Sequence, residues 1–143
     1  MDRKEFLITC GRGCLGLLIG APLLNGCAGT RHYDASIVGI NLVVPLSEFN
    51  RGGGEYRSYV IARNATLQHP ISLFRFSETE YTALSMRCTH KGVELQVLGD
   101  RLHCPAHGSE FSDHGDVLKG PAKSALRTFP VQIDENNLNI DLT

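Results

Sequence analysis

The sequence predicts an all-β protein with a single globular domain. From residue 36 onward, short apolar runs are separated by turn residues, and no long stretch has the periodicity of a helix. The length of 143 residues is ordinary for one domain and is enough to bury a modest core. Successive hairpins of this kind form a small antiparallel sandwich or barrel.

The expected strands follow in chain order. An apolar run at 37–44 stops at Pro45, and a second run covers 56–62. Between them, Arg51-Gly52-Gly53-Gly54 lacks the Lys and Ser or Thr of a phosphate loop, so we interpret it as a flexible turn. Three hairpins complete the fold, with strands at 71–76 and 82–87, at 94–98 and 101–104, and at 127–133 and 138–142.

Two short motifs carry candidate metal ligands. Cys88-Thr89-His90 and Cys104-Pro105-Ala106-His107-Gly108-Ser109 each pair a thiol with an imidazole, and each follows an expected strand. The hairpin between them would bring both motifs to the same end of a sheet. Two cysteines and two histidines can bind one zinc ion tetrahedrally, or hold a two-iron cluster with both thiolates on one iron and both imidazoles on the other. The residues alone leave both alternatives open.

The order Cys-x-His followed by Cys-x-x-His-Gly-Ser resembles the signature of the Rieske iron-sulfur proteins, and the similarity covers residues 36–143. It implies a Rieske-like antiparallel sandwich or barrel, with a small subdomain whose two loops hold one [2Fe-2S] cluster per chain. It also implies that Cys88 and Cys104 bind the inner iron, and that His90 and His107 bind the outer iron near the surface.

Other parts of the family pattern are retained. By resemblance, Gly108 allows close approach of the backbone to the cluster, and Gly120-Pro121-Ala122 is similar to the proline loop that covers it. Ser109 keeps the hydroxyl that high-potential members use to hydrogen-bond a bridging sulfide. These residues extend the expected cofactor site beyond the four ligands.

Two features depart from the respiratory members of the family. Those members carry a disulfide between the ligand loops, and the two corresponding positions here are Val93 and Ala106. Phe111 stands where those members often place a tyrosine bonded to a ligand sulfur. With one of two potential-raising hydrogen bonds kept, we expect a reduction potential between those of the ferredoxin-like and respiratory classes.

The amino terminus resembles an export signal. Arg3 and Lys4 precede an apolar run at 14–24 that is too short for a transmembrane helix. The first residues resemble a twin-arginine signal with lysine in place of the second arginine, a route that suits a protein exported with its cofactor. We therefore expect residues 1–26 to be a signal peptide.

A lipid anchor is expected directly after this signal. Leu24-Asn25-Gly26-Cys27 resembles the lipobox of bacterial lipoproteins, in which the cysteine becomes the lipidated first residue of the mature chain. Residues 27–35 would then form a tether to the domain at 36–143. The expected location is the outer face of a bacterial membrane, toward the periplasm or the cell exterior.

The expected function is electron transfer. The formal net charge of −1 gives no basic excess for nucleic acid, and no nucleophile and base stand together, so we expect no catalytic site of its own. The leading hypothesis is a one-electron carrier that serves a respiratory, quinol-oxidising type of complex, with a redox protein or quinone as partner. The alternatives are a Rieske-type ferredoxin feeding an oxygenase or reductase and, more remotely, a structural zinc module.

Overall fold

The computed structural model describes residues 29–143, which form β-strands and one short 3-10 helix, η1 (Leu46–Phe49). A first sheet has the strand order β1-β6-β7-β8-β13, and a second has the order β14-β15-β3-β2. The strands of the first are β1 (His32–Asp34), β6 (Tyr59–Arg63), β7 (Ile71–Arg75), β8 (Tyr81–Ser85) and β13 (Thr128–Phe129). Those of the second are β2 (Ser36–Val38), β3 (Asn41–Pro45), β14 (Val131–Ile133) and β15 (Asn137–Asp141).

The main core lies between these two sheets. In β3 and β15, partly exposed residues alternate with buried ones, so each strand turns one apolar face inward. The antiparallel register pairs Leu42 with Ile140 and Val44 with Leu138, and all four side chains are fully buried. A slip of one residue would turn these side chains toward solvent, which fixes the register.

The first sheet is covered on both faces. Val60 and Ala62 of β6 belong to the main core, whereas Ile61 between them belongs to a second core. In β8, Ala83 and Leu84 divide in the same way. Because successive side chains of a strand point to opposite faces, this sheet separates the two cores.

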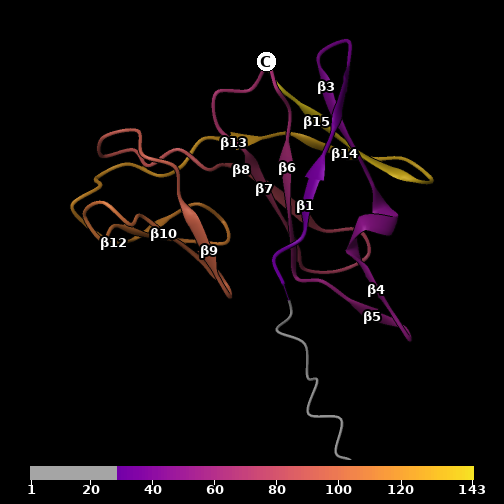
Figure 1. Ribbon diagram of the computed structural model, residues 1–143, viewed down its shortest axis with the longest axis horizontal. Coiled ribbons are helices and arrows are strands. Elements are labelled where there is room, and N and C mark those ends of the chain that lie inside the picture. Colours follow the sequence, from indigo (N-terminus) through magenta and orange to yellow (C-terminus); the bar gives the residue numbers. More distant parts are fainter. Residues whose placement is uncertain (1–28) are drawn as a thin grey trace, which may run out of the picture.

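A third sheet, of strand order β12-β11-β10-β9, forms a small subdomain between β8 and β13 in the chain. Its strands are β9 (Gln96–Leu98), β10 (Arg101–His103), β11 (Glu110–Ser112) and β12 (Val117–Lys119). Figure 1 shows this subdomain, in orange tones, beside the sandwich. Leu102 and Phe111 of the subdomain are fully buried in the second core, which also includes Leu84 of the first sheet. The all-β fold with a small two-loop subdomain is thus confirmed.

The three expected hairpins are present as β7–β8, β9–β10 and β14–β15. Three expected strands are divided. The run at 56–62 breaks at residues 57–58, between β5 (Glu55–Tyr56) and β6, which belong to different sheets. The run at 37–44 reverses at Gly39 and Ile40 and gives the paired strands β2 and β3. The run at 127–133 is interrupted by Pro130, which has no N–H for a ladder, and β13 and β14 join different sheets.

The turn expected at Arg51-Gly52-Gly53-Gly54 is confirmed, within a hairpin of β4 (Asn50–Gly52) and β5 (Glu55–Tyr56). The strands β11 and β12 were not expected from the sequence. Both are short, and β11 begins directly after the second Cys and His motif.

The expected tether at 27–35 is wrong for its last residues. β1 runs parallel to β6, with His32 opposite Ile61, and the Ala35 N–H donates to the Arg63 carbonyl at 2.8 Å. Ala35 is buried in the main core, so the domain begins before residue 36. The expected signal peptide at 1–26 and Cys27 lie outside the described residues. Within residues 29–143, no helix has the length and apolar character needed to cross a membrane.

Candidate metal centre

Two cysteines and two histidines lie in a pair of loops at one end of the subdomain sheet. The first ligand loop (residues 86–95) connects β8 to β9, and the second (residues 104–109) connects β10 to β11. Cys88 and Cys104 are each only 1% exposed, and both are free thiols within the second core. Burial shields both sulfur atoms from solvent and from oxidants.

The two loops have equivalent backbone hydrogen bonds. In the first, the Cys88 N–H donates to the Val93 carbonyl and the Cys88 carbonyl accepts from the Gly92 N–H, both at 2.8 Å. In the second, the Cys104 N–H donates to the carbonyl five residues later at 2.8 Å, and the Cys104 carbonyl accepts from the Gly108 N–H at 3.0 Å. Both glycines have φ of 75°, a conformation that other residues rarely adopt. The two loops therefore present their cysteines in the same way.

The two histidine rings stand edge to face. The ring centroids of His90 and His107 are 4.9 Å apart, with an angle of 88° between the ring planes. His107 is exposed and His90 is half-buried. The Nδ1 atom of His90 is buried without a hydrogen-bond partner. A buried ring nitrogen rarely stays unpaired, and a metal bond would satisfy it.

These donors fit a two-iron cluster. Thiolates and imidazoles are the ligand types of a cluster in which two histidines replace two cysteines on one iron. Among residues 29–143, no three Cys, His, Asp or Glu side chains converge as ligands of a single metal ion. A tetrahedral zinc site would need all four donors around one ion, whereas a two-iron cluster divides them into pairs.

A third loop, the proline loop (residues 120–127), connects β12 to β13 and bonds to both ligand loops. The Ala122 N–H donates to the Ser109 Oγ at 3.0 Å, and the Thr89 Oγ1 donates to the Ser124 carbonyl at 2.7 Å. Ser109 is fully buried, and Gly120 and Pro121 begin the loop directly before Ala122. The proline loop thus holds the two ligand loops together from one side.

No disulfide joins the ligand loops, since Val93 and Ala106 occupy the positions where the respiratory members have cysteines. Val93 packs instead against the second core. The loops are therefore held by apolar packing and by the two hydrogen bonds to the proline loop.

Phe111 occupies a fully buried position on β11 and pairs with Leu102 of β10. Its ring belongs to the same core cluster as Cys88 and Cys104, and it has no hydroxyl to donate. The site therefore keeps the serine hydroxyl but has no tyrosine hydroxyl beside it.

The remaining histidines of the described chain have other neighbours. The Nδ1 of His32 accepts from Arg63 Nε at 3.2 Å, and His103 lies 4.0 Å from the Glu110 carboxylate. His114 stacks on Phe76 with ring centroids 4.5 Å apart. His69 lines a pocket beside the first ligand loop.

Three residues of the site were missed from the sequence. Thr89 lies between two expected ligands, and Ser124 contributes only its carbonyl, which any residue could supply. Gly92 has the same role in the first loop as Gly108 in the second. A comparison of the two motifs could have found Gly92, since a glycine lies four residues after each cysteine.

The arrangement agrees with a known family. The family model described as "Rieske [2Fe-2S] domain" matches residues 43–130, which include both ligand loops and the proline loop. A plasma membrane Rieske protein from Synechocystis PCC 6803 has a similar structure, with a TM-score of 0.52 and 29% identity over 59% of this chain and 86% of that one. The site thus shares its fold and sequence pattern with proteins that bind a [2Fe-2S] cluster.

Curated relatives are iron-sulfur subunits of cytochrome b6-f complexes. The subunit of Chlorobaculum tepidum is 27% identical over 102 residues, which are 70% of this chain and 52% of the relative, so the chain spans about half of that protein's length. The subunit of Nostoc punctiforme is 26% identical over 96% of this chain and 83% of the relative. The family match, covering more than half of the sequence, shows that the chain belongs to the Rieske family and carries one [2Fe-2S] cluster.

Proposed function

We propose that the protein is a one-electron carrier that acts as the iron-sulfur subunit, or a partner, of a membrane-associated quinol-oxidising oxidoreductase. The observation that carries this proposal is the pair of equivalent Cys and His loops within a matched Rieske domain. The b6-f subunits among the relatives support the quinol-oxidising class of complex.

We assign the cluster ligands as Cys88, Cys104, His90 and His107. The free, buried thiols and the unpartnered Nδ1 of His90 support this assignment. When bound, the cluster supplies the one-electron redox centre. The buried cysteines and the proline loop exclude water from one side of the site, while the exposed edge of His107 is open to a partner. Electrons would therefore enter and leave on the histidine side.

The cluster assignment is tested on the anaerobically purified protein. The oxidised protein should be coloured and contain two irons and two sulfides per chain, and the reduced protein should be paramagnetic. Cys104→Ala should abolish these signals, whereas His114→Ala, an exposed histidine outside the site, should keep them. A colourless protein with one zinc per chain would contradict the assignment.

The partner class needs a separate experiment. The absent inter-loop disulfide, at Val93 and Ala106, favours the ferredoxin-type alternative, whereas the relatives favour a quinol-oxidising complex. Stopped-flow mixing of the oxidised holoprotein with quinol and its own membranes should reduce the cluster. Reduction only by a soluble ferredoxin reductase would support the alternative.

We further propose export, with residues 1–26 as signal peptide and Cys27 as the lipid anchor. The lipobox-like Leu24-Asn25-Gly26-Cys27 supports this step, and the relatives include a plasma membrane Rieske protein. Radiolabelled fatty acid should be incorporated into the wild type and into Cys14→Ser, but not into Cys27→Ser. Label in Cys27→Ser would contradict the anchor.

A further inference from the structure

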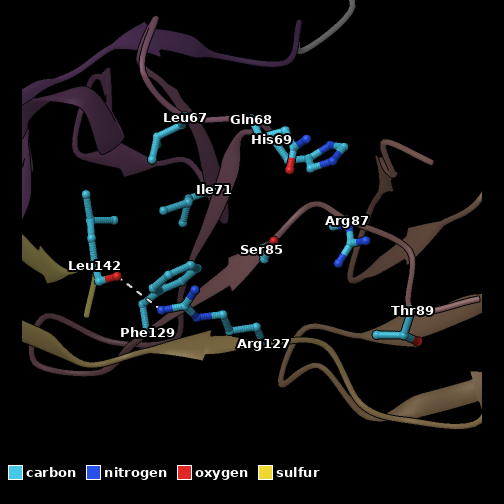
Figure 2. A pocket seen from close by; sticks show the side chains of 10 residues that line it. All are labelled: Leu67, Gln68, His69, Ile71, Ser85, Arg87, Thr89, Arg127, Phe129 and Leu142. Carbon is cyan, nitrogen blue, oxygen red and sulfur yellow. Dashed lines mark hydrogen bonds between the residues drawn. The ribbon is translucent and has the colours of Figure 1, made fainter. Parts of the chain in front are cut away.

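A pocket of about 310 Å³ lies beside the first ligand loop, and none of the four assigned cluster ligands lines it. Ile71 of β7, Ser85 of β8 and Phe129 of β13 line it, together with Arg87 and Thr89 from the ligand loop (Figure 2). The pocket therefore reaches from the first sheet of the sandwich to the residues on either side of Cys88.

The lining of this pocket is cationic. It includes the guanidinium groups of Arg87 and Arg127 and no carboxylate side chain. Arg127 donates to the backbone oxygens of Leu142 and Thr143, both at 3.1 Å, and its guanidinium lies 4.6 Å over the Phe129 ring, so it is already held by the pocket wall. None of the ion pairs within residues 29–143 includes the Arg87 guanidinium.

One lining residue, His69, has a polar atom that is enclosed by the protein. The Nδ1 of His69 is buried without a hydrogen-bond partner. Figure 2 shows Arg87 with Thr89 toward one end of the pocket, and Leu67, Ile71 and Phe129 toward the other, where the Arg127 guanidinium lies beside Phe129 and Leu142. The unpaired guanidinium of Arg87 and the apolar side chains across the pocket together suit a ligand with a negative group on a small apolar body.

We propose that this pocket binds a small organic anion, such as a carboxylate with an apolar ring or chain. The Arg87 guanidinium would bind the anionic group through charge-assisted hydrogen bonds. The apolar body would lie against Leu67, Ile71 and Phe129, where its burial is favourable.

Anion binding is coupled to the cluster through Arg87. This residue precedes Cys88, and its Nε lies 3.2 Å from the position a Cβ would take at Gly92, so its guanidinium packs on the ligand loop. Reduction adds one negative charge to the cluster, which repels a neighbouring anion. The oxidised protein therefore binds the anion more tightly, and the bound anion lowers the reduction potential, because coupling between two sites is reciprocal.

Calorimetric titration of the holoprotein with benzoate tests the proposal, with neutral benzamide as the matched control ligand. Benzoate should bind one to one, and several-fold more tightly to the oxidised form than to the reduced form. Arg87→Gln should weaken binding about tenfold through loss of a charge-assisted hydrogen bond. Arg51→Gln removes an exposed arginine from the β4–β5 hairpin and should leave the affinity unchanged.

The cluster spectrum of each variant shows that it is folded. Absence of saturable benzoate binding, equal binding of benzamide, or an equal loss in Arg51→Gln would overturn the pocket assignment. Binding with the same affinity in both redox states would overturn the coupling. These outcomes are independent of which redox partner the protein uses.

Discussion

The Ser109 hydroxyl oxygen accepts a hydrogen bond from the Ala122 backbone N–H at 3.0 Å, within a fully buried site. Because the oxygen is engaged as an acceptor, the hydroxyl hydrogen remains available to donate. The resemblance to the Rieske family predicts that this hydrogen would bond to a sulfide of the cluster. The bond from Ala122 in the proline loop fixes the position of the Ser109 oxygen.

Removal of this hydroxyl should lower the reduction potential. A hydrogen bond to the cluster stabilises its more negative, reduced form, so Ser109→Ala should lower the potential and Phe111→Tyr, which adds a donor, should raise it. A bond worth about 1.4 kcal/mol corresponds to about 60 mV for one electron. Redox titration measures both shifts.

A control for this series is Ser112→Ala. The Ser112 Oγ accepts from the backbone N–H groups of His114 and Asp116, away from the ligand loops. Its loss should leave the potential unchanged. Unchanged potentials for both Ser109→Ala and Phe111→Tyr would contradict the hydrogen-bond account.

Thr89→Val should weaken the link between the first ligand loop and the proline loop. It removes the 2.7 Å bond to the Ser124 carbonyl and should cost about 0.5–1.5 kcal/mol. We expect the cluster of this variant to bleach faster in urea. The visible absorbance of the cluster measures the rate. Thr66→Val removes a bond of similar length, to Asn64 at 2.8 Å, within the loop between β6 and β7 and should not change the bleaching rate, because this bond does not involve the proline loop. Equal rates in the two variants would show that the link is not needed.

The two cores should differ in their effect on the cluster. Leu102→Ala and Leu138→Ala each create a cavity at a fully buried site and should each cost about 2–5 kcal/mol of unfolding free energy. Leu102 shares its core with both cysteines, whereas Leu138 lies between the two sheets of the sandwich. Iron content after purification should fall in Leu102→Ala and stay at the wild-type level in Leu138→Ala. The opposite order would contradict this division of the cores.

Asp134 should make the free energy of unfolding depend on pH in the acid range. Hydrogen bonds from the Asn136 N–H, the Asn139 amide and the Asn137 N–H lower the pKa of its carboxyl from the usual 3.8. A lowered pKa in the folded state contributes stability above pH 3.8, which is lost as the pH falls through the lowered value.

Thermal unfolding between about pH 5 and pH 2 measures this contribution. The difference in Tm between the wild type and Asp134→Asn should shrink as the pH falls. Glu135→Gln removes a charge from the same turn without removing these hydrogen bonds. The difference in Tm between the wild type and Glu135→Gln should therefore change less with pH. A constant difference for Asp134→Asn would refute the effect.

Local patterns were sufficient to predict most of the sandwich. Alternating apolar residues and turn residues identified the β14–β15 hairpin, and the spacing of Cys and His identified the four candidate ligands. The failures involve interactions between distant parts of the chain. β1 is a strand because it pairs with β6, whose partner residue Ile61 lies far along the sequence from His32.

Backbone groups explain what was missed in the site. The Ala122 N–H and the Ser124 carbonyl support the ligand loops, and any residue type other than proline could supply both. Their role comes from the path of the proline loop, which the side chains at those positions do not encode. The chain passes from one sheet to another at Pro130, between β13 and β14. The apolar run around Pro130 does not indicate this change of sheet, so it could not be predicted from the local sequence.

The parallel pairing of β1 limits how far an anchored domain could move. Only residues 28–31 lie between Cys27, the proposed anchor, and the first paired residue, His32. A fully extended chain of this length reaches about 18 Å. An anchored domain would therefore stay close to the membrane surface. It would exchange electrons with partners in or on the same membrane and not with distant ones.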